Sequence, residues 1–251
     1  MIALLAALEE EASGLRRQMA LAPEGVAGLR GPAYAGRYQG RAVLLARTGM
    51  GRQRAEASAE AVLARYQVTA VISIGFSGAL EGRLEVGDVV LASELIGITG
   101  PDGNEIEPTI YQADRGLLRA ASEALRATPL HVVLGPTVTA PGIIATPAEK
   151  QGLGRQTGAV AVDMESYWVA RAASDRGLPF LALRAISDAQ GELLPPILQI
   201  VDADGVPRAR RLAAHLVREP GSLVALVKLA RNAGRARRAL TTGVACTVAA
   251  L

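Results

Sequence analysis

The sequence predicts an α/β protein, a three-layer α/β/α sandwich around a mixed, mostly parallel central sheet. Short apolar runs rich in Val, Ile and Leu alternate along the chain with segments of helical period, which is the element order of such folds. The apolar runs are continuous rather than alternating, a pattern typical of strands that are covered on both faces. The chain has 251 residues and is 50% hydrophobic, so it can bury one large core.

The expected strands and helices follow one another up to residue 186. The strands are expected at Ile2–Ala7, Ala42–Ala46, Ala70–Ile74, Val89–Ala92, Leu130–Leu134, Val160–Val162 and Phe180–Ile186. The helices are expected at Gln53–Tyr66, Arg115–Ala127, Thr146–Leu153 and Ser166–Arg176, and Gly177 with Pro179 ends the last of them. Gly and Pro between Gly97 and Pro108 predict an excursion loop there.

The C-terminal part is expected to be helical in separate pieces. One piece is Arg208–Arg218, and Glu219-Pro220-Gly221 interrupts it before a second piece, Ser222–Asn232. Gly234 then precedes a last stretch. We therefore expect a catalytic domain over residues 1–205 and a basic helical extension over residues 206–251 that packs on or near it.

Several protein classes are excluded by composition. No apolar run approaches the roughly 20 residues that span a bilayer. The first apolar run has no basic residue before it and continues into three glutamates, so we expect a strand there rather than a signal peptide. The single cysteine, Cys246, allows no internal disulfide and fits a reducing cytoplasm. Two histidines and one cysteine cannot build the usual zinc site, so we expect neither a metal nor a cofactor.

Charge is distributed unevenly along the chain. From Arg208 onward there are nine Lys or Arg and one acid, whereas 18 basic and 23 acidic residues precede it. Such a basic tail indicates an anionic partner, either nucleic acid or a phospholipid surface. The tail has no aromatic residue for base stacking, so we expect no nucleic acid. A merely solvated helix face is the alternative.

A glycine-rich turn follows the second expected strand. Gly49-Met50-Gly51-Arg52-Gln53-Arg54 has the position of a dinucleotide-binding fingerprint, but Arg54 stands at its third glycine place. No acid follows at a strand end about twenty residues later, as that fingerprint requires. The sequence favours a tight strand-to-helix turn, whose helix N-terminus forms one wall of a small-ligand site.

Three groups of acidic residues follow expected strands. Glu9-Glu10-Glu11 follows the first strand, Asp163-Met164-Glu165 follows another, and Ser187-Asp188 ends a third that also contains Arg184. Each group has an ordinary structural explanation, namely helix N-terminal charge, capping or ion pairing. Because all three lie at strand ends, where α/β sheets form their ligand crevices, we expect them to build one site.

These motifs resemble those of a known superfamily. The three acidic groups, together with Val86-Gly87-Asp88-Val89-Val90 and Arg184-Ala185-Ile186-Ser187-Asp188, resemble the nucleoside phosphorylases and nucleosidases over residues 1–200. The methylthioadenosine/S-adenosylhomocysteine nucleosidase branch is the most similar part of that superfamily. Within the superfamily, the chain resembles the hopanoid-associated phosphorylases, also described as adenosylhopane nucleosidases, more closely still. Its motifs match this subfamily less tightly than they match the superfamily as a whole. This resemblance rests on Asp163–Ser166, Gly177–Ala182, Leu194-Pro195-Pro196 and the basic segment Arg218–Arg231.

The resemblance implies cleavage of the N-glycosidic bond of a 5′-modified adenosine, foremost adenosylhopane, with release of adenine in hopanoid biosynthesis. By similarity, Asp188 is the general acid that protonates the purine at N7. Glu11 positions and deprotonates the attacking water, and Arg184 pairs with Glu11 and keeps it ionised. Glu165 binds the ribose hydroxyls and stabilises the cationic sugar, and Met164 packs beneath the ribose. The resemblance also implies a homodimer.

The base site is also inferred from the resemblance. Ile144 and Ser187 are expected beside the adenine. Ile143 stands where smaller-substrate relatives have the aromatic residue that stacks on the purine. Trp168, the only tryptophan, lies either near the site or in the core, and core packing is the commoner outcome.

The phosphate grip of the phosphorolytic relatives is altered in this chain. Ser73 stands at the place of their phosphate-binding arginine, and Phe76 stands at the place of a hydroxyl residue. Without that guanidinium the bidentate anion clamp is lost, so hydrolysis is favoured over phosphorolysis. The candidate phosphate or water site comprises Gly75, Ser77, Arg47 and Arg52.

A lipid-linked substrate would explain the basic tail, because an enzyme that acts on such a substrate has to contact the membrane surface. Leu223, Leu226, Val227 and Ala230 are expected on one helical face that lies in the membrane interface, so the cytoplasmic protein would contact the inner membrane peripherally. The tail helices alternatively cap the sheet or form a subunit contact. Two other functions stay open: cleavage of soluble methylthioadenosine or S-adenosylhomocysteine, and nucleoside binding without catalysis.

Overall fold

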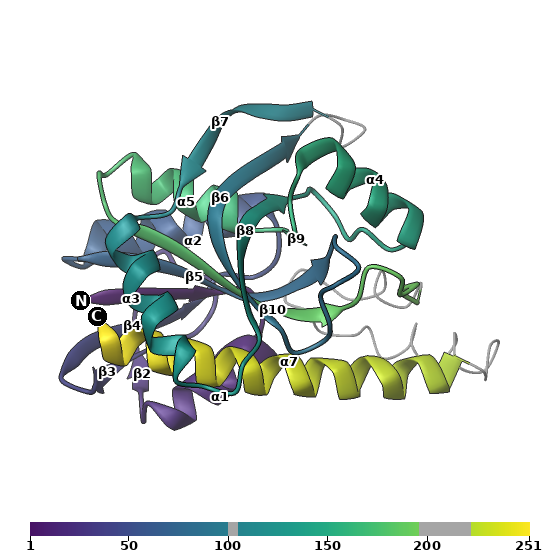
Figure 1. Cartoon of the computed structure of the whole chain (residues 1–251). Helices are drawn as coiled ribbons and strands as arrows, with labels where there is room; N and C mark the ends of the chain where they lie inside the picture. Colours follow the sequence, from purple (N-terminus) through teal and green to yellow (C-terminus); the bar gives the residue numbers. More distant parts are fainter. Residues whose placement is uncertain (100–104, 196–221) are drawn as a thin grey trace.

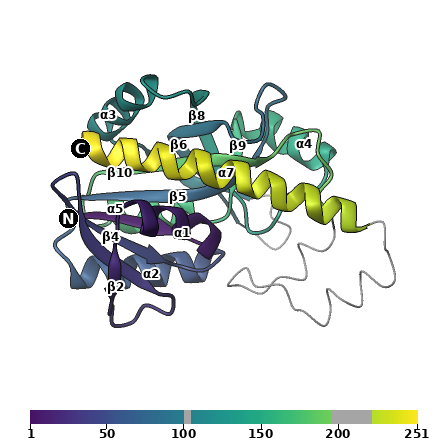
Figure 2. The same cartoon turned by 90° about the horizontal axis from the view of Figure 1, so that it is seen from below.

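A twisted mixed sheet forms the centre of the molecule, and helices cover both of its faces (Figures 1 and 2). The computed structural model describes residues 1–99, 105–195 and 222–251. The strands are β1 (Ile2–Ala6), β2 (Ala22–Glu24), β3 (Ala33–Tyr38), β4 (Arg41–Arg47), β5 (Ala70–Ala79), β6 (Val89–Thr99), β7 (Glu105–Gln112), β8 (Val132–Thr139), β9 (Ala161–Asp163) and β10 (Phe180–Asp188). The helices are α1 (Glu9–Gln18), α2 (Arg52–Arg65), α3 (Arg115–Arg126), α4 (Pro147–Thr157), α5 (Ser166–Ser174) and α7 (Ser222–Ala250).

Part of the sheet closes on itself. β10 pairs with both β6 and β5, and β9 pairs with both β8 and β5, so β5, β10, β6, β8 and β9 form a ring. From β5 the sheet continues openly through β1, β4, β3 and β2. β1 is parallel to both of its neighbours, β4 and β5, whereas β10 with β6 and β9 with β5 are antiparallel. The predicted α/β/α sandwich with a mixed sheet is confirmed, and the ring is an additional feature.

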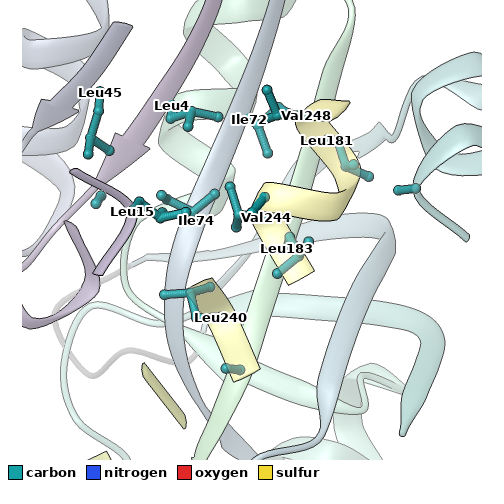
Figure 3. Close-up of a cluster of buried hydrophobic side chains, with 14 of the residues drawn as sticks. Leu4, Leu15, Leu45, Ile72, Ile74, Leu181, Leu183, Leu240, Val244 and Val248 are labelled. Atoms are coloured by element: carbon teal, nitrogen blue, oxygen red, sulfur yellow. The ribbon is translucent and has the colours of Figure 1, made fainter. Parts of the chain in front are cut away.

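One face of the sheet is covered by α1, α3 and α7 (Figure 2). The apolar cluster on this face includes Leu4, Leu15, Ile72, Ile74, Leu183, Leu240, Val244 and Val248, which Figure 3 labels. Burying each of these side chains contributes about 1.5–3 kcal/mol. The second half of α7 is therefore part of the main core.

The opposite face is covered by α2 and α5. Their buried residues include Val62 of α2, and Tyr167 and Trp168 of α5. Trp168 is only 2% exposed, and its ring contacts Tyr167 edge to face at 4.9 Å between ring centroids. The only tryptophan is thus a core residue.

The C-terminal helix is longer than the sequence predicted. α7 runs without a break from Ser222 to Ala250 and passes through Gly234, where the sequence predicted an interruption. A glycine inside a helix costs only about 1 kcal/mol relative to alanine, and the burial of Ala236, Leu240 and Val244 beyond it outweighs that cost. The predicted helix Arg208–Arg218 and the domain boundary at residue 205 lie outside the described residues.

The predicted excursion loop is largely a pair of antiparallel strands. β6 extends to Thr99 and β7 begins at Glu105, and Ile98 pairs with Ile106. Pro108 is tolerated because β7 lies at an edge, where one side of the strand needs no ladder bonds. The prediction of a loop over Gly97–Pro108 was therefore wrong for the described residues of this stretch. In the described ranges, no helix has the length and apolar character needed to cross a bilayer.

Candidate active site

A pocket of about 570 Å³ lies where several strands end. Residues that follow β1, β8 and β9, and the last residues of β5 and β10, line one part of it, while α7 lines another. Of the residues that the sequence singled out, it brings together Glu11, Ser77, Ile144, Met164, Glu165, Ser187 and Asp188. The three acidic groups therefore meet in one place, as their positions after strands predicted.

Glu11 is fixed by backbone donors. It lies in the first turn of α1, and its Oε2 accepts hydrogen bonds from the backbone amides of Ala7 at 2.8 Å and Leu8 at 2.9 Å. Its Oε1 accepts a third from the amide of Phe76 at 2.8 Å. Burial raises the pKa of Glu11 above 4.5, although the charge of Arg184 and these amides oppose that shift. The carboxyl group is both a helix cap and part of the pocket lining.

Arg184 is 1% exposed and is not among the residues that line the pocket. Its Nη2 donates to the hydroxyl groups of Ser73 and Ser166, each at 2.7 Å. Its Nε lies 2.9 Å from Oδ2 of Asp163 and donates to Ser166 Oγ at 3.0 Å. The prediction that Arg184 forms an ion pair with Glu11 is therefore corrected. Among the described ion pairs, the carboxylate partner of Arg184 is Asp163. The charge of Arg184 still lowers the pKa of Glu11 without a direct contact between the two side chains.

Gly75 allows this crowded arrangement. A Cβ atom at Gly75 would clash with Arg184 Nη1 and with Glu11 Oε1, so the two charged groups approach each other across a position without a side chain. Ser73, two residues before Gly75 on β5, accepts the hydrogen bond from Arg184 Nη2. A side chain at position 75 would therefore push Arg184 and Glu11 apart.

Glu165 is a second buried acid of the pocket whose ionisation the protein disfavours. Its Oε1 accepts a hydrogen bond from the amide of Gly51 at 2.8 Å, so the glycine turn supports it directly. Gly51 has a φ of 84°, which a side chain would disfavour. Burial, reinforced by the nearby charges of Asp163 and Glu11, raises the pKa of Glu165 to about 8 against the opposing charge of Arg184.

Asp188 is held by side chains. Its Oδ1 accepts a hydrogen bond from Ser187 Oγ at 2.7 Å, and its Oδ2 lies 2.5 Å from Nζ of Lys150. Lys150 comes from α4 and is 0% exposed. Sequence reasoning missed this lysine, and the available signal was its spacing of three residues from the apolar Leu153 on the same helix, which put it on the buried face.

The candidate phosphate or water site is divided by the structure. Ser77 lines the pocket, and its buried hydroxyl has no hydrogen-bond partner among the described residues. Arg47 and Arg52 are not among the lining residues. Nη1 of Arg47 lies 3.8 Å from Oε2 of Glu9. The guanidinium carbon of Arg52 lies 4.1 Å from the centre of the Trp168 ring, and its Nε lies 3.3 Å from Oε1 of Glu56.

A stripe of small and apolar residues on α7 forms the remaining lining. The stripe, called here the α7 wall, consists of Leu226, Leu229, Ala230, Ala233 and Gly234, and Arg237 follows it at the pocket edge. Spacings of three and four residues place these side chains on one helical face. The sequence placed Leu226 and Ala230 with Val227 on a membrane-facing side, and this is corrected, since the first two line the pocket while Val227 is 62% exposed. The side chain of Leu223 lies outside the described part.

The chemical capacity of the pocket follows from these two linings. Glu11, Glu165 and Asp188, called here the acid floor, can exchange protons with a polar ligand and stabilise positive charge on it. The α7 wall offers apolar contact to another part of the same ligand. Across the described residues, no group of three or more His, Cys, Asp and Glu side chains is placed to hold a metal ion.

Several known proteins are similar to this chain in sequence or in fold. Residues 1–219 match the sequence model of the phosphorylase superfamily. A 5′-methylthioadenosine/S-adenosylhomocysteine nucleosidase of Bacillus licheniformis is 30% identical over 201 residues, which cover 76% of this chain and 87% of that protein. The crystal structure of the enzyme of the same name from Neisseria meningitidis, in complex with methylthio-immucillin-A, has a TM-score of 0.78 at 23% identity and covers 100% of this chain and 99% of its own. The futalosine hydrolase of Helicobacter pylori has a TM-score of 0.73 at 18% identity, with 97% and 96% of the two chains covered.

Proposed function

The chain belongs to the phosphorylase superfamily and is an N-ribosyl nucleosidase or phosphorylase, and we propose that its substrate is an adenosine with a large apolar 5′ substituent, foremost adenosylhopane. The proposed reaction is hydrolytic and releases adenine in hopanoid biosynthesis. The relatives named above are nucleosidases, and the structure with methylthio-immucillin-A binds a nucleoside analogue. The coarser assignment is therefore an enzyme that acts on adenosine-like nucleosides.

The α7 wall is the observation that carries the proposed substrate. Leu226, Leu229 and Ala230 line the same pocket as the acid floor, so a nucleoside bound over the acids has apolar surface within reach. A methylthio group needs little of that surface, whereas a long hydrocarbon buries it at about 25 cal/mol per Å². The wall therefore favours a large apolar 5′ group over a small one.

In the proposed reaction, water replaces adenine at C1′ of the ribose. The bond between C1′ and N9 breaks with its electron pair moving to the purine, and Asp188 gives a proton to N7. The water oxygen bonds to C1′ and passes its proton to Glu11, whose raised pKa makes it a better base than an exposed glutamate. Glu165 accepts hydrogen bonds from the ribose hydroxyls, and Met164 packs beneath the sugar. As positive charge develops on the ribose, it favours the ionised form of Glu165 and is stabilised by it.

The proposed preference for water over phosphate rests on the missing anion clamp. Ser73 replaces the arginine, and its hydroxyl is engaged by Arg184. Arg47 contacts Glu9, and Arg52 stacks on Trp168, so neither guanidinium lines the pocket. Ser77 is the remaining polar group at this corner, and a single hydroxyl suits water better than a doubly charged anion.

A peripheral membrane contact is part of the same proposal. Lys228, Arg231, Arg235 and Arg238 are exposed on α7, at spacings that give one basic stripe along the helix. Each basic residue near an anionic leaflet adds about 1 kcal/mol, which is enough for reversible docking. The stripe lies on the face of α7 opposite the α7 wall, so docking through it would place the pocket beside the helix that contacts the membrane.

We also propose a homodimer. Ile106 and Ile110 of the edge strand β7 are 45% and 47% exposed, and an apolar edge of this kind suits a second copy of the chain. Light scattering after size exclusion tests this, with a dimer mass expected for the wild type. A monomer mass at micromolar concentration overturns it.

The decisive experiment is adenine release from adenosylhopane in detergent micelles, with and without phosphate. Methylthioadenosine serves as the competing substrate. Release from adenosylhopane in both buffers, at a higher kcat/KM than from methylthioadenosine, is the expected result. Release only with phosphate would overturn hydrolysis and direct mutagenesis to Arg47 and Arg52. Cleavage of methylthioadenosine alone would favour the alternative, a methylthioadenosine/S-adenosylhomocysteine nucleosidase, which the curated relatives represent.

A further inference from the structure

A buried lysine stands directly behind the proposed acid. Lys150 has no exposed surface, and all three of its N–H donors have acceptors in the protein. Nζ lies 2.5 Å from Asp188 Oδ2, 2.9 Å from the carbonyl oxygen of Ala189 and 3.3 Å from that of Glu192. These three acceptors match the three N–H donors of an ammonium group.

The start and the buried face of α4 fix the position of Lys150. α4 begins with Pro147 and a reciprocal capping box between Thr146 and Glu149, so the helix start next to Lys150 is rigid. One turn later Leu153 is buried in the apolar cluster beside Val162, which keeps the same face of α4 inward. From this face Lys150 reaches Asp188, the last residue of β10.

We propose that Lys150 is the positioning residue of Asp188: its ammonium group aims the carboxyl group into the pocket and sets the pH at which that group loses its catalytic proton. The inference rests on the proposed role of Asp188 as proton donor. A single hydrogen bond from Ser187 would leave the carboxyl group free to rotate, whereas donors on both oxygens fix its plane. Charge matters as well, because a neighbouring ammonium group favours the ionised form of a carboxyl group and makes its protonated form a stronger acid.

The surroundings of Asp188 allow the effect of Lys150 to be separated. Glu11 comes from α1, Glu165 precedes α5, and Arg237 of α7 lines the same pocket. The carboxylate of Glu192 contacts Lys228, with Oε1 3.0 Å from Nζ. Only the backbone carbonyl oxygen of Glu192 accepts a hydrogen bond from Lys150. Among the described ion pairs, the only partner of Asp188 is Lys150. A change at Lys150 therefore acts on Asp188 first.

The alternative is a purely structural bond that ties α4 to the segment after β10. Both roles predict a loss of activity on substitution, but they differ in the pH profile. Removing a structural tie lowers kcat/KM equally at every pH. Removing the charge of Lys150 keeps the carboxyl group protonated to higher pH, so the alkaline limb of the profile moves upward.

The test is the pH profile of kcat/KM between pH 5 and 10, measured as adenine release from an adenosine nucleoside that the wild type cleaves. The variants are Lys150→Gln, which keeps a hydrogen-bond donor without the charge, and Lys150→Arg, which keeps the charge. Arg155→Met, which removes an exposed positive charge from the same helix, is the matched control. Thermal melting of each variant verifies folding, and Lys150→Met replaces Lys150→Gln if that variant fails to melt cooperatively.

We expect the alkaline midpoint to rise by about one to three pH units in Lys150→Gln or Lys150→Met, with about a tenfold lower plateau. In Lys150→Arg and in the control the midpoint stays within about half a unit of the wild type. Equal loss with an unmoved midpoint, or no loss at all, overturns the inference. A wild type that releases adenine from no nucleoside would instead refute the proposed function before Lys150 is tested.

Discussion

The acid floor and the α7 wall of one pocket are built in different ways. The acids are 3–8% exposed, and each has a strand end or helix start behind it and at least one hydrogen bond from the protein. The α7 wall belongs to the first half of a single long helix, where Leu226 and Leu229 are only partly buried. The floor is thus determined by the sheet, whereas the wall is determined by how one C-terminal helix is anchored. Chemistry and substrate choice can therefore be altered separately.

The largest expected effect separates the floor from the wall. Asp188→Asn keeps the shape of the side chain but removes the proposed proton donor, so kcat for adenine release should fall by about 10²- to 10⁴-fold. Binding of an uncleaved nucleoside analogue, measured by calorimetry, should change much less because the α7 wall is intact. A fall of less than tenfold in kcat would remove Asp188 from the role of acid.

The next effect concerns the anchor of the α7 wall. Leu240→Ala removes a fully buried side chain from the core beneath the sheet, and the free energy of unfolding should fall by about 2–5 kcal/mol. Val227→Ala, on an exposed position of the same helix, should change it by less than about 0.5 kcal/mol. Urea unfolding measures both. Similar values for the two variants would mean that α7 is not anchored through its second half.

A third prediction concerns the pH dependence of stability at the floor. The pKa of Glu165 is about 8 in the folded protein and 4.5 in the reference state, so between these values the folded state binds more protons than the unfolded state. Stability from this group is therefore fully present below about pH 4.5 and is lost as pH rises toward 8. Glu165→Gln should raise Tm at pH 8 by roughly 10 °C and leave Tm at pH 5 nearly unchanged.

The pKa of Glu11 is raised as well, so stability from this group is also lost as pH rises. Glu165→Gln should therefore reduce the fall of Tm with pH without abolishing it. Scanning calorimetry from pH 5 to 8 gives the comparison. Parallel curves for the wild type and the variant would show that Glu165 ionises normally.

The smallest expected effect is on the outside of α7. Reversing two charges of the basic stripe, Arg231→Glu with Arg235→Glu, should weaken binding to vesicles rich in anionic lipid by about tenfold or more at low salt. Deleting the whole extension is a poorer test, because it would also strip Leu240 and Val244 from the core. Arg155→Glu on α4 controls for net charge. Unchanged sedimentation of the double variant would leave the stripe a solvated helix face.

The fold was predictable where one strong pattern determined an element. Continuous apolar runs located the strands of the ring and β1, because burial on both faces leaves little room for polar residues. β2 was missed since Ala22–Glu24 is short and exposed, and β7 was missed because Gly and Pro near it outweighed its alternation. The break predicted at Gly234 failed because tertiary packing outweighs local helix propensity.

The site was predictable only in part, for a related reason. The acids follow strands, so their meeting in one pocket could be expected from topology alone. Lys150 and the partner of Arg184 could not, because both depend on which side chains cross between elements distant in sequence. Leu226 and Ala230 of the α7 wall were predicted on a membrane-facing side together with Leu223 and Val227, because periodicity shows that a helix has an apolar side without showing what that side contacts.

The most direct test of the account is the substrate preference of a variant in the α7 wall. Leu229→Asp and the exposed control Val227→Asp are assayed in detergent with methylthioadenosine and with an adenosine that carries a long 5′-alkylthio chain. We predict that Leu229→Asp lowers the ratio of kcat/KM for the long-chain substrate to that for methylthioadenosine by about 10- to 200-fold, while the control keeps the wild-type ratio. An unchanged ratio in Leu229→Asp, or an equal loss on both substrates, would contradict the assignment of substrate choice to α7.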